Sequence, residues 1–479
     1  MTALVGVDVG TSSTKAIAID PDGTILGHVQ AEYPVSLPRP GHAEQDPDLW
    51  WQAAEAALAD LGAEDVAGIG LSGQMHGLVL LDDRLRPLRP AILWNDQRTA
   101  AECDEIEATV GLERLIALTG NRALTGFTAP KLLWVRRHEP DVYRRIAHVL
   151  LPKDYVRLRL TGELVTDVSD ASGTLLFDVG ARTWSEQMLD LLDLPGEWFP
   201  QALESGSPSG TTSAGLPVAA GAGDQAAGAL GVGVDRPGSV SVALGTSGVV
   251  FGVLPALAAD PRGTAHTFCH AVPGTWHAMG VMLSAAGALE WLHTSVLPGS
   301  SIEALLEAAA AWEPGCQGLQ FAPYLSGERT PHADPAVRGA FVGLALSHDA
   351  GALVRAVLEG VAYGLRDSLE LLRGLGLRPS AGRIGGGGSR SELWRRIVAS
   401  VLDLPLEITA ADDAAALGAA MLGGVAAGSF ADVPAAVAAC VRVTGRIEPD
   451  PAWREPYADG YAAFRRLYPA IAGLRAAGG

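Results

Sequence analysis

The chain has 479 residues, 48% of them hydrophobic, so it can bury a large core but exceeds the length at which one core keeps growing, and two domains are expected. Its formal net charge of −19 without a long basic run excludes a nucleic-acid-binding protein, and the lack of a run of about 20 apolar residues excludes a membrane-spanning one. No signal core opens the chain, so we expect a cytoplasmic protein with four reduced, scattered cysteines: Cys103, Cys269, Cys316 and Cys440.

The first quarter of the chain predicts a strand meander followed by a helix. The apolar runs "LVGVDVG" and "TKAIAID" meet at a Gly-Thr-Ser turn, and the turn "PDGT" leads to a third strand. Asp46 as N-cap, Pro47 at the first helical position and Gly62 as the stop predict a helix between them. The apolar "VAGIGLSGQ" returns to a buried strand, which completes a β-β-β-α-β order typical of an α/β protein.

The same pattern begins again in the middle of the chain. After the Pro/Gly-rich "VDRPGS", the segment "VSVALGTSGVVFGVL" repeats the strand, Gly-Thr-Ser turn and strand. A repeated supersecondary unit indicates an internal duplication, with domains over residues 1–237 and 238–479. Later a strand runs into Gly385–Gly388, and Ser389 with Glu392 three residues on predicts a capping box at the next helix.

The two Gly-Thr-Ser turns have the composition of phosphate-binding loops. Glycine and small hydroxyl residues let backbone N–H groups approach phosphate oxygens without a Cβ in the way, and two such turns would grip a triphosphate from opposite sides. A lone carboxylate beside the first turn, Asp8, is the ligand type that Mg²⁺ takes, and Lys15 on the following strand is placed to reach the transferring phosphate. The predicted phosphate contacts are Gly10, Thr11, Ser12, Lys15, Gly245, Thr246 and Ser247.

Taken singly, each turn is equally well explained as ordinary turn chemistry, and the repetition favours the phosphate-loop interpretation. A Walker-type loop is excluded because "GTSSTK" lacks the second glycine before the lysine. The glycine run could be a hinge. Because no G-x-G-x-x-G opens a helix there, packing of Gly386, Gly387 and Ser389 against an adenine ring is preferred to NAD binding.

At this point the residues resemble the FGGY family of carbohydrate kinases over nearly the whole chain. "GFTAPKLLWVRRH", residues 126–138, is similar to the first family signature, and "GAFVGLALSHDAGALVRAVLE", residues 339–359, to the second, with one departure at Ala352. The resemblance implies a duplicated actin/Hsp70-like (ribonuclease H-like) α/β ATPase fold with two domains around a central cleft. It also implies ATP and Mg²⁺ as cofactors, with adenosine bound at Gly385–Ser389.

Five segments are most similar to the xylulokinase branch of this family: "EQDPDLWWQA", "GQMHG", "RPAILWNDQR", "LLPKDYVRLRLTGE" and "PYLSGERTPHADP". The resemblance implies phosphorylation of D-xylulose at O5 by MgATP, and a homodimer. Asp224, at a Gly-rich turn before a small-residue helix, matches the general base, and Gln225 follows where many relatives have Asn. From the motif alone, Asp224 is more often a helix cap.

The expected sugar pocket draws on two further segments. Met75 and His76 end a buried strand; the resemblance gives Met75 as an apolar wall and His76 as a donor to a sugar hydroxyl, although a lone His at a strand end is more often structural. Trp94 and Asp96 add a ring face and a polar group, or else belong to the core and a turn. "SGERTP" either supports the cleft or is a solvated loop.

Two rival functions remain open from the sequence. One is the same chemistry on another ketose or polyol, because fold and phosphate loops are shared within the family and only pocket residues differ. The other is a non-catalytic actin-like ATPase that uses its nucleotide state to bind partners. Asp224 beside a sugar-type pocket favours a kinase, and we expect the domains to close when sugar binds.

Overall fold

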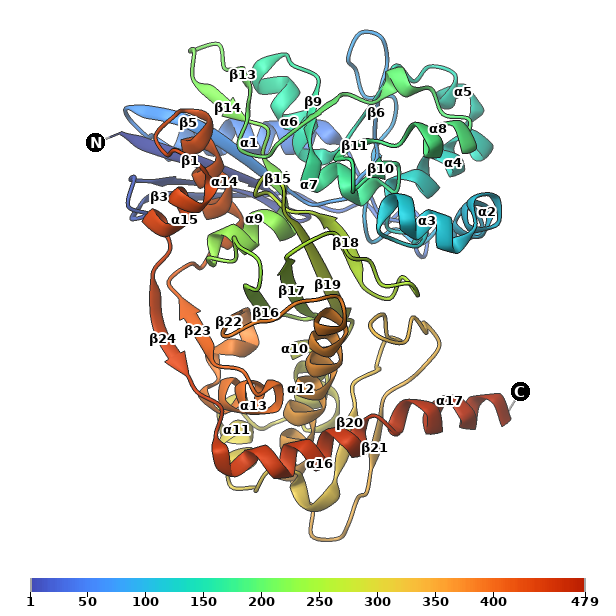
Figure 1. Ribbon diagram of the computed structural model, residues 1–479, viewed down its shortest axis with the longest axis vertical. Helices are drawn as coiled ribbons and strands as arrows, with labels where there is room; N and C mark the ends of the chain where they lie inside the picture. Colours follow the sequence, from blue (N-terminus) through green and yellow to red (C-terminus); the bar gives the residue numbers. More distant parts are fainter. Residues whose placement is uncertain (1, 478–479) are drawn as a thin grey trace.

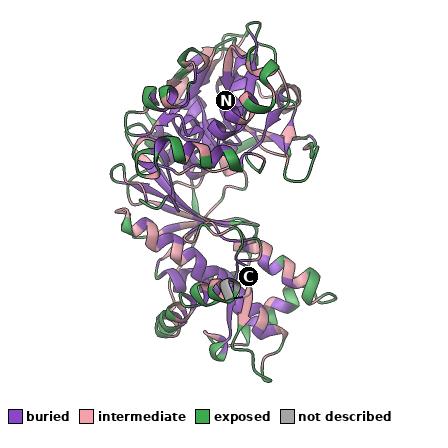
Figure 2. Ribbon diagram, turned by 90° about the vertical axis from the view of Figure 1, so that its right-hand side faces the viewer, coloured by how far each residue is buried: buried purple, intermediate pink, exposed green. Residues whose placement is uncertain are grey.

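Each half of the chain builds its own seven-stranded sheet, so the molecule has two lobes joined by a narrower waist (Figures 1 and 2). The computed structural model describes residues 2–477. The sheet of the first lobe has the order β13-β14-β5-β1-β2-β3, with β15 also paired to β5. Its strands are β1 (Ala3–Val9), β2 (Ser13–Ile19), β3 (Ile25–Glu32), β5 (Val66–Gly73), β13 (Pro208–Thr211), β14 (Pro217–Ala219) and β15 (Ala222–Gly223).

The sheet of the second lobe has the order β18-β19-β17-β16-β22-β23-β24. Its β16–β17 hairpin is antiparallel and β16 pairs in parallel with β22, as β1 pairs antiparallel with β2 and in parallel with β5. The predicted duplication of the strand, turn and strand unit is therefore visible in the pairing. The strands are β16 (Val240–Leu244), β17 (Gly248–Leu254), β18 (His266–Cys269), β19 (Trp276–Met282), β22 (Gly382–Gly385), β23 (Leu406–Thr409) and β24 (Val443–Ile447).

Helix α1 begins and ends where the sequence predicts. It spans Pro47–Leu61, the Asp46 side chain accepts a hydrogen bond from the Asp48 amide, and Gly62 follows with a left-handed φ of 58°. By contrast, the predicted capping box at Ser389 is wrong, because Gly387–Arg390 form a 3₁₀ turn (η5) and Ser391 is the N-cap of α13 (Glu392–Leu402). The glycine turn thus continues two residues further than the sequence pattern indicated.

A late helix completes the first lobe. Helix α14 (Ala414–Ala426) packs against β1 and β5, as its place beside those strands in Figure 1 shows, with α15 (Val433–Cys440) next to it. The approach requires glycine in the sheet: a Cβ on Gly70 would lie 1.7 Å from the Ala419 carbonyl oxygen. The final part of the chain therefore returns to the lobe that its beginning builds.

Helices between β5 and β13 form the rest of the first lobe: α2 (Ala100–Val110), α3 (Leu112–Thr119), α4 (Thr128–His138), α5 (Pro140–Tyr143), α6 (Pro152–Thr161), α7 (Val168–Ala171) and α8 (Glu186–Leu191). Helix α9 (Asp224–Gly231) leads to the second lobe, which contains α10 (Ala286–Trp291), α11 (Ile302–Ala310), α12 (Ala350–Gly374), α16 (Arg454–Phe464) and α17 (Leu467–Ala477). Short strand pairs join loops: β4 (Glu44–Gln45) with β7 (Ala91–Ile92), β6 (Val79–Leu81) with β8 (His148–Leu150), β9 (Val165–Asp167) with β12 (Gln201–Leu203), β10 (Phe177–Asp178) with β11 (Thr183–Trp184), and β20 (Gln320–Ala322) with β21 (Ala340–Val342).

The lobes share hydrophobic core where β17–β19 reach the helices of the first lobe. Phe251, Phe268 and Met279 of the second sheet are buried in one cluster with residues of α2 and α4, and buried residues continue through this region in Figure 2. All four cysteines are buried and none forms a disulfide, as expected. Among residues 2–477, no helix combines the length and the apolar character that a membrane span requires.

Candidate active site

The first Gly-Thr-Ser turn is a tight hairpin between β1 and β2, in which the Gly10 amide donates to the Ser13 carbonyl at 3.0 Å. Two carbonyl oxygens of this turn accept hydrogen bonds from side chains of the same lobe. Tyr33 Oη donates to the Gly10 oxygen at 2.7 Å, and Gln45 Nε2 donates to the Thr11 oxygen at 2.7 Å. Because carbonyl oxygens repel an anion, engaging them inside the protein leaves the turn better suited to a phosphate.

Two buried glutamines hold this turn, and sequence reasoning missed both. Gln74 Nε2 donates to the Gly10 oxygen at 3.2 Å, and Gln74 Oε1 accepts from Thr11 Oγ1 at 3.2 Å. Gln45 Oε1 accepts from Trp50 Nε1 at 3.0 Å and from Gln74 Nε2 at 3.2 Å. Both glutamines stand in segments that resemble the family, "EQDPDLWWQA" and "GQMHG", which was the available signal.

Asp8 and Lys15 face each other across the β1–β2 hairpin. Ser72 Oγ donates to Asp8 Oδ1 at 2.9 Å, and burial raises the pKa of Asp8, which the Ser72 hydrogen bond and the Lys15 charge partly offset. Lys15 forms an ion pair with Asp413, just before α14, and His28 Nε2 lies 3.0 Å from the same carboxylate. Lys15 is therefore held by a residue of the chain's last quarter at the edge of the turn.

The second turn, Gly245–Ser247, is supported in the same way. The amides of Ala285 and Ala286, at the start of α10, each donate at 2.8 Å, to the carbonyls of Thr246 and Gly245 respectively. Beside it lies the glycine turn after β22. Gly386 has φ +89°, and a Cβ there would lie 2.7 Å from the Leu244 carbonyl oxygen, so only glycine fits. Ser389 Oγ donates to the Gly386 oxygen at 2.7 Å, which closes this turn internally.

A cavity of about 170 Å³ lies between the lobes. It brings together Asp224 with five other predicted residues from distant segments, Met75, His76, Trp94, Gln225 and Ser247. Residues that the sequence did not single out complete its wall from the second lobe: Val249, His266, Met279, Val281 and Arg329. Both lobes therefore contribute polar and apolar side chains to one cavity.

Asp224 is the first residue of α9, and Gly223 rather than Asp224 is the N-cap, with no side-chain capping bond. Its carboxylate is free for the cavity, so the helix-cap alternative is not realised. Burial raises the pKa of Asp224 to about 7, with a further contribution from the negative charge of Asp8, while hydrogen bonds from Gln225 act in the opposite direction. A carboxylate with this pKa can accept a proton near neutral pH.

His76 stands at the cavity in a left-handed conformation, with φ +69°. Its Nδ1 lies 2.7 Å from the Gly173 carbonyl oxygen, so Nδ1 carries the proton and donates it. Burial lowers the pKa of His76 to about 3, which keeps the ring neutral and makes Nε2 a hydrogen-bond acceptor. The expectation that His76 donates to a sugar hydroxyl is therefore wrong, because the Gly173 carbonyl fixes the opposite tautomer.

Trp94 and Asp96, predicted as neighbours in the pocket, have different positions. Trp94 is 45% exposed, lines the cavity and donates from Nε1 to Thr11 Oγ1 at 3.0 Å, which links the cavity wall to the first turn. Asp96 is fully buried and does not line the cavity. Its carboxylate accepts from Arg98 Nη2 at 2.7 Å and from the Ala43 amide at 2.6 Å, as expected for the structural alternative.

His266 and Arg329 form a pair in the wall contributed by the second lobe. His266 Nδ1 lies 3.2 Å from Asn121 Oδ1, and Arg329 Nη1 lies 3.4 Å from His266 Nε2, so the ring donates on one side and accepts on the other. Burial lowers the pKa of both side chains, and Arg329 stays charged because an arginine remains far from neutrality. The "SGERTP" loop thus brings a cation to the cavity.

The residues present fit a magnesium ion. Mg²⁺ is bound through one or two carboxylates together with phosphate oxygens and water. Asp8 and Asp224 supply two half-buried carboxylates whose pKa values are both raised by partial burial, and a nearby cation would offset that cost. Within residues 2–477, no group of three or more His, Cys, Asp or Glu side chains could hold a metal ion. A magnesium ion here would therefore depend on phosphate oxygens and water as additional ligands.

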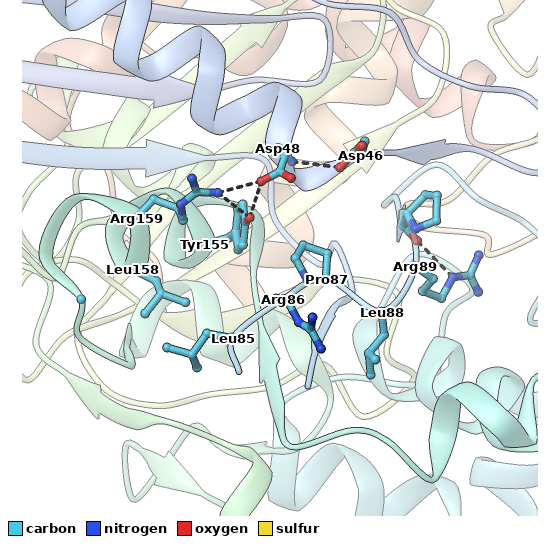
Figure 3. A pocket seen from close by; sticks show the side chains of 12 residues that line it. Asp46, Asp48, Leu85, Arg86, Pro87, Leu88, Arg89, Tyr155, Leu158 and Arg159 are labelled. Atoms are coloured by element: carbon cyan, nitrogen blue, oxygen red, sulfur yellow. Dashed lines mark hydrogen bonds and ion pairs between the residues drawn. The ribbon is translucent and has the colours of Figure 1, made fainter. Parts of the chain in front are cut away.

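A larger cavity, of about 760 Å³, lies away from these residues on the first lobe (Figure 3). None of the predicted site residues lines it. Two of its charged groups are paired with each other: Arg159 Nη1 donates to Asp48 Oδ1 at 2.7 Å and also to Tyr155 Oη at 2.9 Å. Size alone therefore does not identify the active site of this protein.

Comparison with known proteins agrees with the two-lobed architecture. The N-terminal domain of the FGGY family of carbohydrate kinases matches residues 3–231, and the C-terminal domain of the same family matches residues 240–427. The chain belongs to the FGGY family of carbohydrate kinases and is a phosphotransferase. The resemblance expected from the sequence and the actin/Hsp70-like fold class are both confirmed.

Individual relatives narrow the comparison. The chain is 46% identical to the xylulose kinase of Escherichia coli over 438 residues, which cover 88% of this chain and 90% of the relative. It is 35% identical to a xylulose kinase of known structure from Rhodospirillum rubrum, with a TM-score of 0.93 and 98% and 99% of the two chains covered. A gluconate kinase from Lactobacillus acidophilus is 25% identical, also with a TM-score of 0.93, over 98% of each chain.

Proposed function

We propose that the protein transfers the terminal phosphoryl group of ATP to O5 of D-xylulose, with Asp224 as the general base. One observation carries the proposal: a carboxylate with a pKa of about 7 faces a small cavity between the lobes, which Ser247 of the second Gly-Thr-Ser turn also lines. Phosphoryl transfer requires one carboxylate to accept the proton of the attacking hydroxyl, while positioned donors and a metal neutralise charge. The similarity to xylulose kinases supports D-xylulose as the sugar.

The nucleotide is assigned to the two turns and the glycine run. Gly10–Ser12 and Gly245–Ser247 would donate backbone and hydroxyl hydrogen bonds to the phosphates, and Gly385–Ser389 would pack against adenosine. Mg²⁺ would be held by Asp8, on the same hairpin as the first turn, and would supply positive charge to the phosphate oxygens. Lys15, beside Asp8 and paired with Asp413, would add a second cation to this wall.

The sugar is assigned to the wall made by Met75, His76 and Trp94. Neutral His76 would accept a hydrogen bond from a sugar hydroxyl through Nε2, and Arg329 from the second lobe would donate one. Trp94 would present its ring to the carbon chain of the sugar, and Gln225 would add a polar contact beside the base. Asp224 would take the proton from O5 as that oxygen attacks the phosphate.

The two lobes divide these roles. We assign residues 1–237 to sugar binding, the first phosphate turn and the base, and residues 238–479 to the second phosphate turn and adenosine, although α14 of the second part packs on the first sheet.

We further propose a cytoplasmic homodimer. The four unbridged buried thiols favour the cytoplasm, and the family resemblance favours the dimer. Analytical ultracentrifugation of the purified protein tests the dimer, and a single species of about the 49.6 kDa chain mass would contradict it.

The deciding experiment is sugar-dependent ADP release by the purified protein with MgATP. The panel contains D-xylulose, D-ribulose, L-ribulose, glycerol and D-gluconate, the last because one similar structure is a gluconate kinase. We expect D-xylulose to give the highest kcat/KM by at least about tenfold, the effect of roughly one hydrogen bond in the pocket. A different leading sugar would overturn the substrate assignment, and ADP release without any sugar would favour the partner-binding ATPase.

A further inference from the structure

A cluster of five charged side chains is buried in the first lobe beneath the cavity. Lys153 Nζ lies 2.7 Å from Asp154 Oδ1, 2.8 Å from Asp167 Oδ1 and 3.0 Å from Asp170 Oδ2, and Arg157 Nη2 donates to Asp154 Oδ1 at 2.8 Å. Each of these side chains is at most 1% exposed. Lys153 is one of only three lysines in the chain and stands in the family-like segment "LLPKDYVRLRLTGE".

Stability alone does not explain this cluster. Removing ions from water costs several kcal/mol per group, and replacing a buried ion pair with apolar side chains is often neutral or stabilising. Burial raises the pKa of Asp170 well above its ordinary value, and the Lys153 charge partly offsets this effect. A buried polar network of this kind is suited to fixing the geometry of groups attached to it.

Hydrogen bonds run from this cluster to the residue before Asp224. Asp167 Oδ2 accepts from Ser169 Oγ at 2.6 Å, and Ser169 Oγ in turn accepts from the Gly223 amide at 3.2 Å. Arg157 Nη1 donates to the Ala220 carbonyl at 2.6 Å. The cluster therefore holds the strand that delivers the carboxylate at two points, three residues apart.

The segment that contains Asp167 and Ser169 also supports the proposed sugar-binding wall. Helix α7 (Val168–Ala171) continues into the 3₁₀ turn η1 (Ser172–Thr174), where the Gly173 carbonyl accepts from His76 Nδ1. Ser172 Oγ accepts from the Cys269 amide of β18 at 3.0 Å, which connects the turn to the second sheet. The stretch from Asp167 to Thr174 thus contacts His76 and the residue that precedes Asp224.

We propose that Lys153, Asp167 and Ser169 are positioning residues for the reaction: through the Gly223 amide they fix the orientation of the Asp224 carboxylate toward the attacking hydroxyl. This inference rests on the proposed role of Asp224 as the base. Lys153 orients Asp167, Asp167 orients the Ser169 hydroxyl, and that hydroxyl holds Gly223. A misplacement of about 1 Å at a reacting group lowers a rate by roughly 100-fold, so the network is expected to act on kcat.

Two serines make a matched pair for the test. Ser169 and Ser205 are both fully buried, and both donate from Oγ to Asp167 Oδ2, at 2.6 and 2.9 Å. Only the Ser169 side chain reaches Gly223. Ser205 contacts Gly221 solely through its backbone carbonyl, which alanine retains. Ser169→Ala and Ser205→Ala therefore remove the same kind of hydrogen bond from Asp167, and only one of them releases the Asp224 strand.

We expect Ser169→Ala to lower kcat by about tenfold to 100-fold with KM for ATP within about twofold, and Ser205→Ala to keep kcat within about threefold. Amide hydrogen exchange at Gly223 should become faster in Ser169→Ala only. Equal losses of kcat in the two variants, or unchanged kcat in Ser169→Ala, would overturn the positioning role. If the wild-type protein phosphorylates no sugar, the proposed function fails, and Gly223 exchange that is equal in all three proteins would independently overturn the hydrogen-bond path.

Discussion

The carboxylates of Asp8 and Asp224 are electrostatically coupled. Ser72 Oγ donates a hydrogen bond to the Asp8 side chain on β1. The negative charge of Asp8 raises the pKa of Asp224, although burial of Asp224 is the larger cause. A base with a pKa of about 7 is partly ionised at neutral pH and strong enough to accept a hydroxyl proton in a transition state. The proposed metal ligand Asp8 would thus also tune the proposed base, Asp224.

This pKa leads to a prediction for the pH profile. Asp224 accepts a proton only when ionised, so kcat/KM should fall about tenfold per pH unit below an apparent pKa of about 7 and level off above it. Asp224→Asn should lower kcat by about 10²- to 10⁴-fold and abolish this acid limb, with the binding of ATP retained. Steady-state kinetics from pH 5 to 9 measure both effects. A variant that kept the acid limb would assign it to another group.

The influence of Asp8 can be measured separately. Asp8→Asn removes a negative charge that raises the pKa of Asp224, so the acid limb of kcat/KM should move to lower pH while overall activity falls through weaker metal binding. Asp22→Asn, on the exposed turn between β2 and β3, controls for the loss of one negative charge and should keep the wild-type profile. An acid limb that stays in place in Asp8→Asn would contradict the coupling.

At the scale of elements, one local unit is used twice and a late helix packs on the first copy. Each Gly-Thr-Ser turn has its carbonyls bound by the protein, by Tyr33, Gln45 and Gln74 in the first turn and by the start of α10 in the second. Helix α14 packs on the first sheet and is preceded by Asp413, which holds Lys15 beside the first turn. The position of α14 is therefore expected to affect both the stability of the first lobe and the proposed phosphate site.

The close packing of α14 predicts a strong effect of one added methyl group. Gly70→Ala would place a Cβ 1.7 Å from the Ala419 carbonyl oxygen, so the helix must shift, at a cost of about 1–3 kcal/mol or more. We expect a lowered melting temperature in calorimetry together with a higher KM for ATP. Gly374→Ala, at the end of α12 with no neighbouring atom within 4 Å of the added Cβ, should not lower the melting temperature and should leave KM for ATP unchanged. An equal melting temperature in the two variants would contradict the described contact.

At the scale of the whole molecule, the cavity belongs to both lobes. His76, Trp94 and Asp224 come from the first lobe, and His266 and Arg329 come from the second. A sugar bound there, as proposed, would contact both lobes at once, and binding energy would be gained when the lobes approach. Closure of two domains over a sugar and a nucleotide also expels the water that would otherwise accept the phosphoryl group.

We therefore predict that ligands make the molecule more compact. Small-angle X-ray scattering should give a smaller radius of gyration with D-xylulose and a non-hydrolysable MgATP analogue than without ligands. Asp224→Asn should show the same change, because it removes the base and retains the binding contacts. Scattering curves that coincide with and without ligands would argue against closure.

The sequence alone determined the features that depend on neighbouring residues. The α/β class, the limits of α1, the duplicated hairpin, the family and the candidate base all follow from short motifs, because turn geometry, capping and strand periodicity are local properties. Five of the residues expected in the sugar pocket meet in one cavity, and the resemblance of their segments to the family was the signal that identified them. Asp96 does not, because Arg98 and the Ala43 amide take up its carboxylate.

Only the tertiary structure decided the remaining features, which depend on contacts between distant segments. Lys15 and Asp413 are 398 residues apart in the chain, and Ser169 and Gly223 are 54 apart, so no local pattern links them. The tautomer of His76 is set by a carbonyl 97 residues away. His266 and Arg329 join the cavity only because the second sheet packs against the first lobe. Chain folding, rather than residue type, determines which partners these side chains meet.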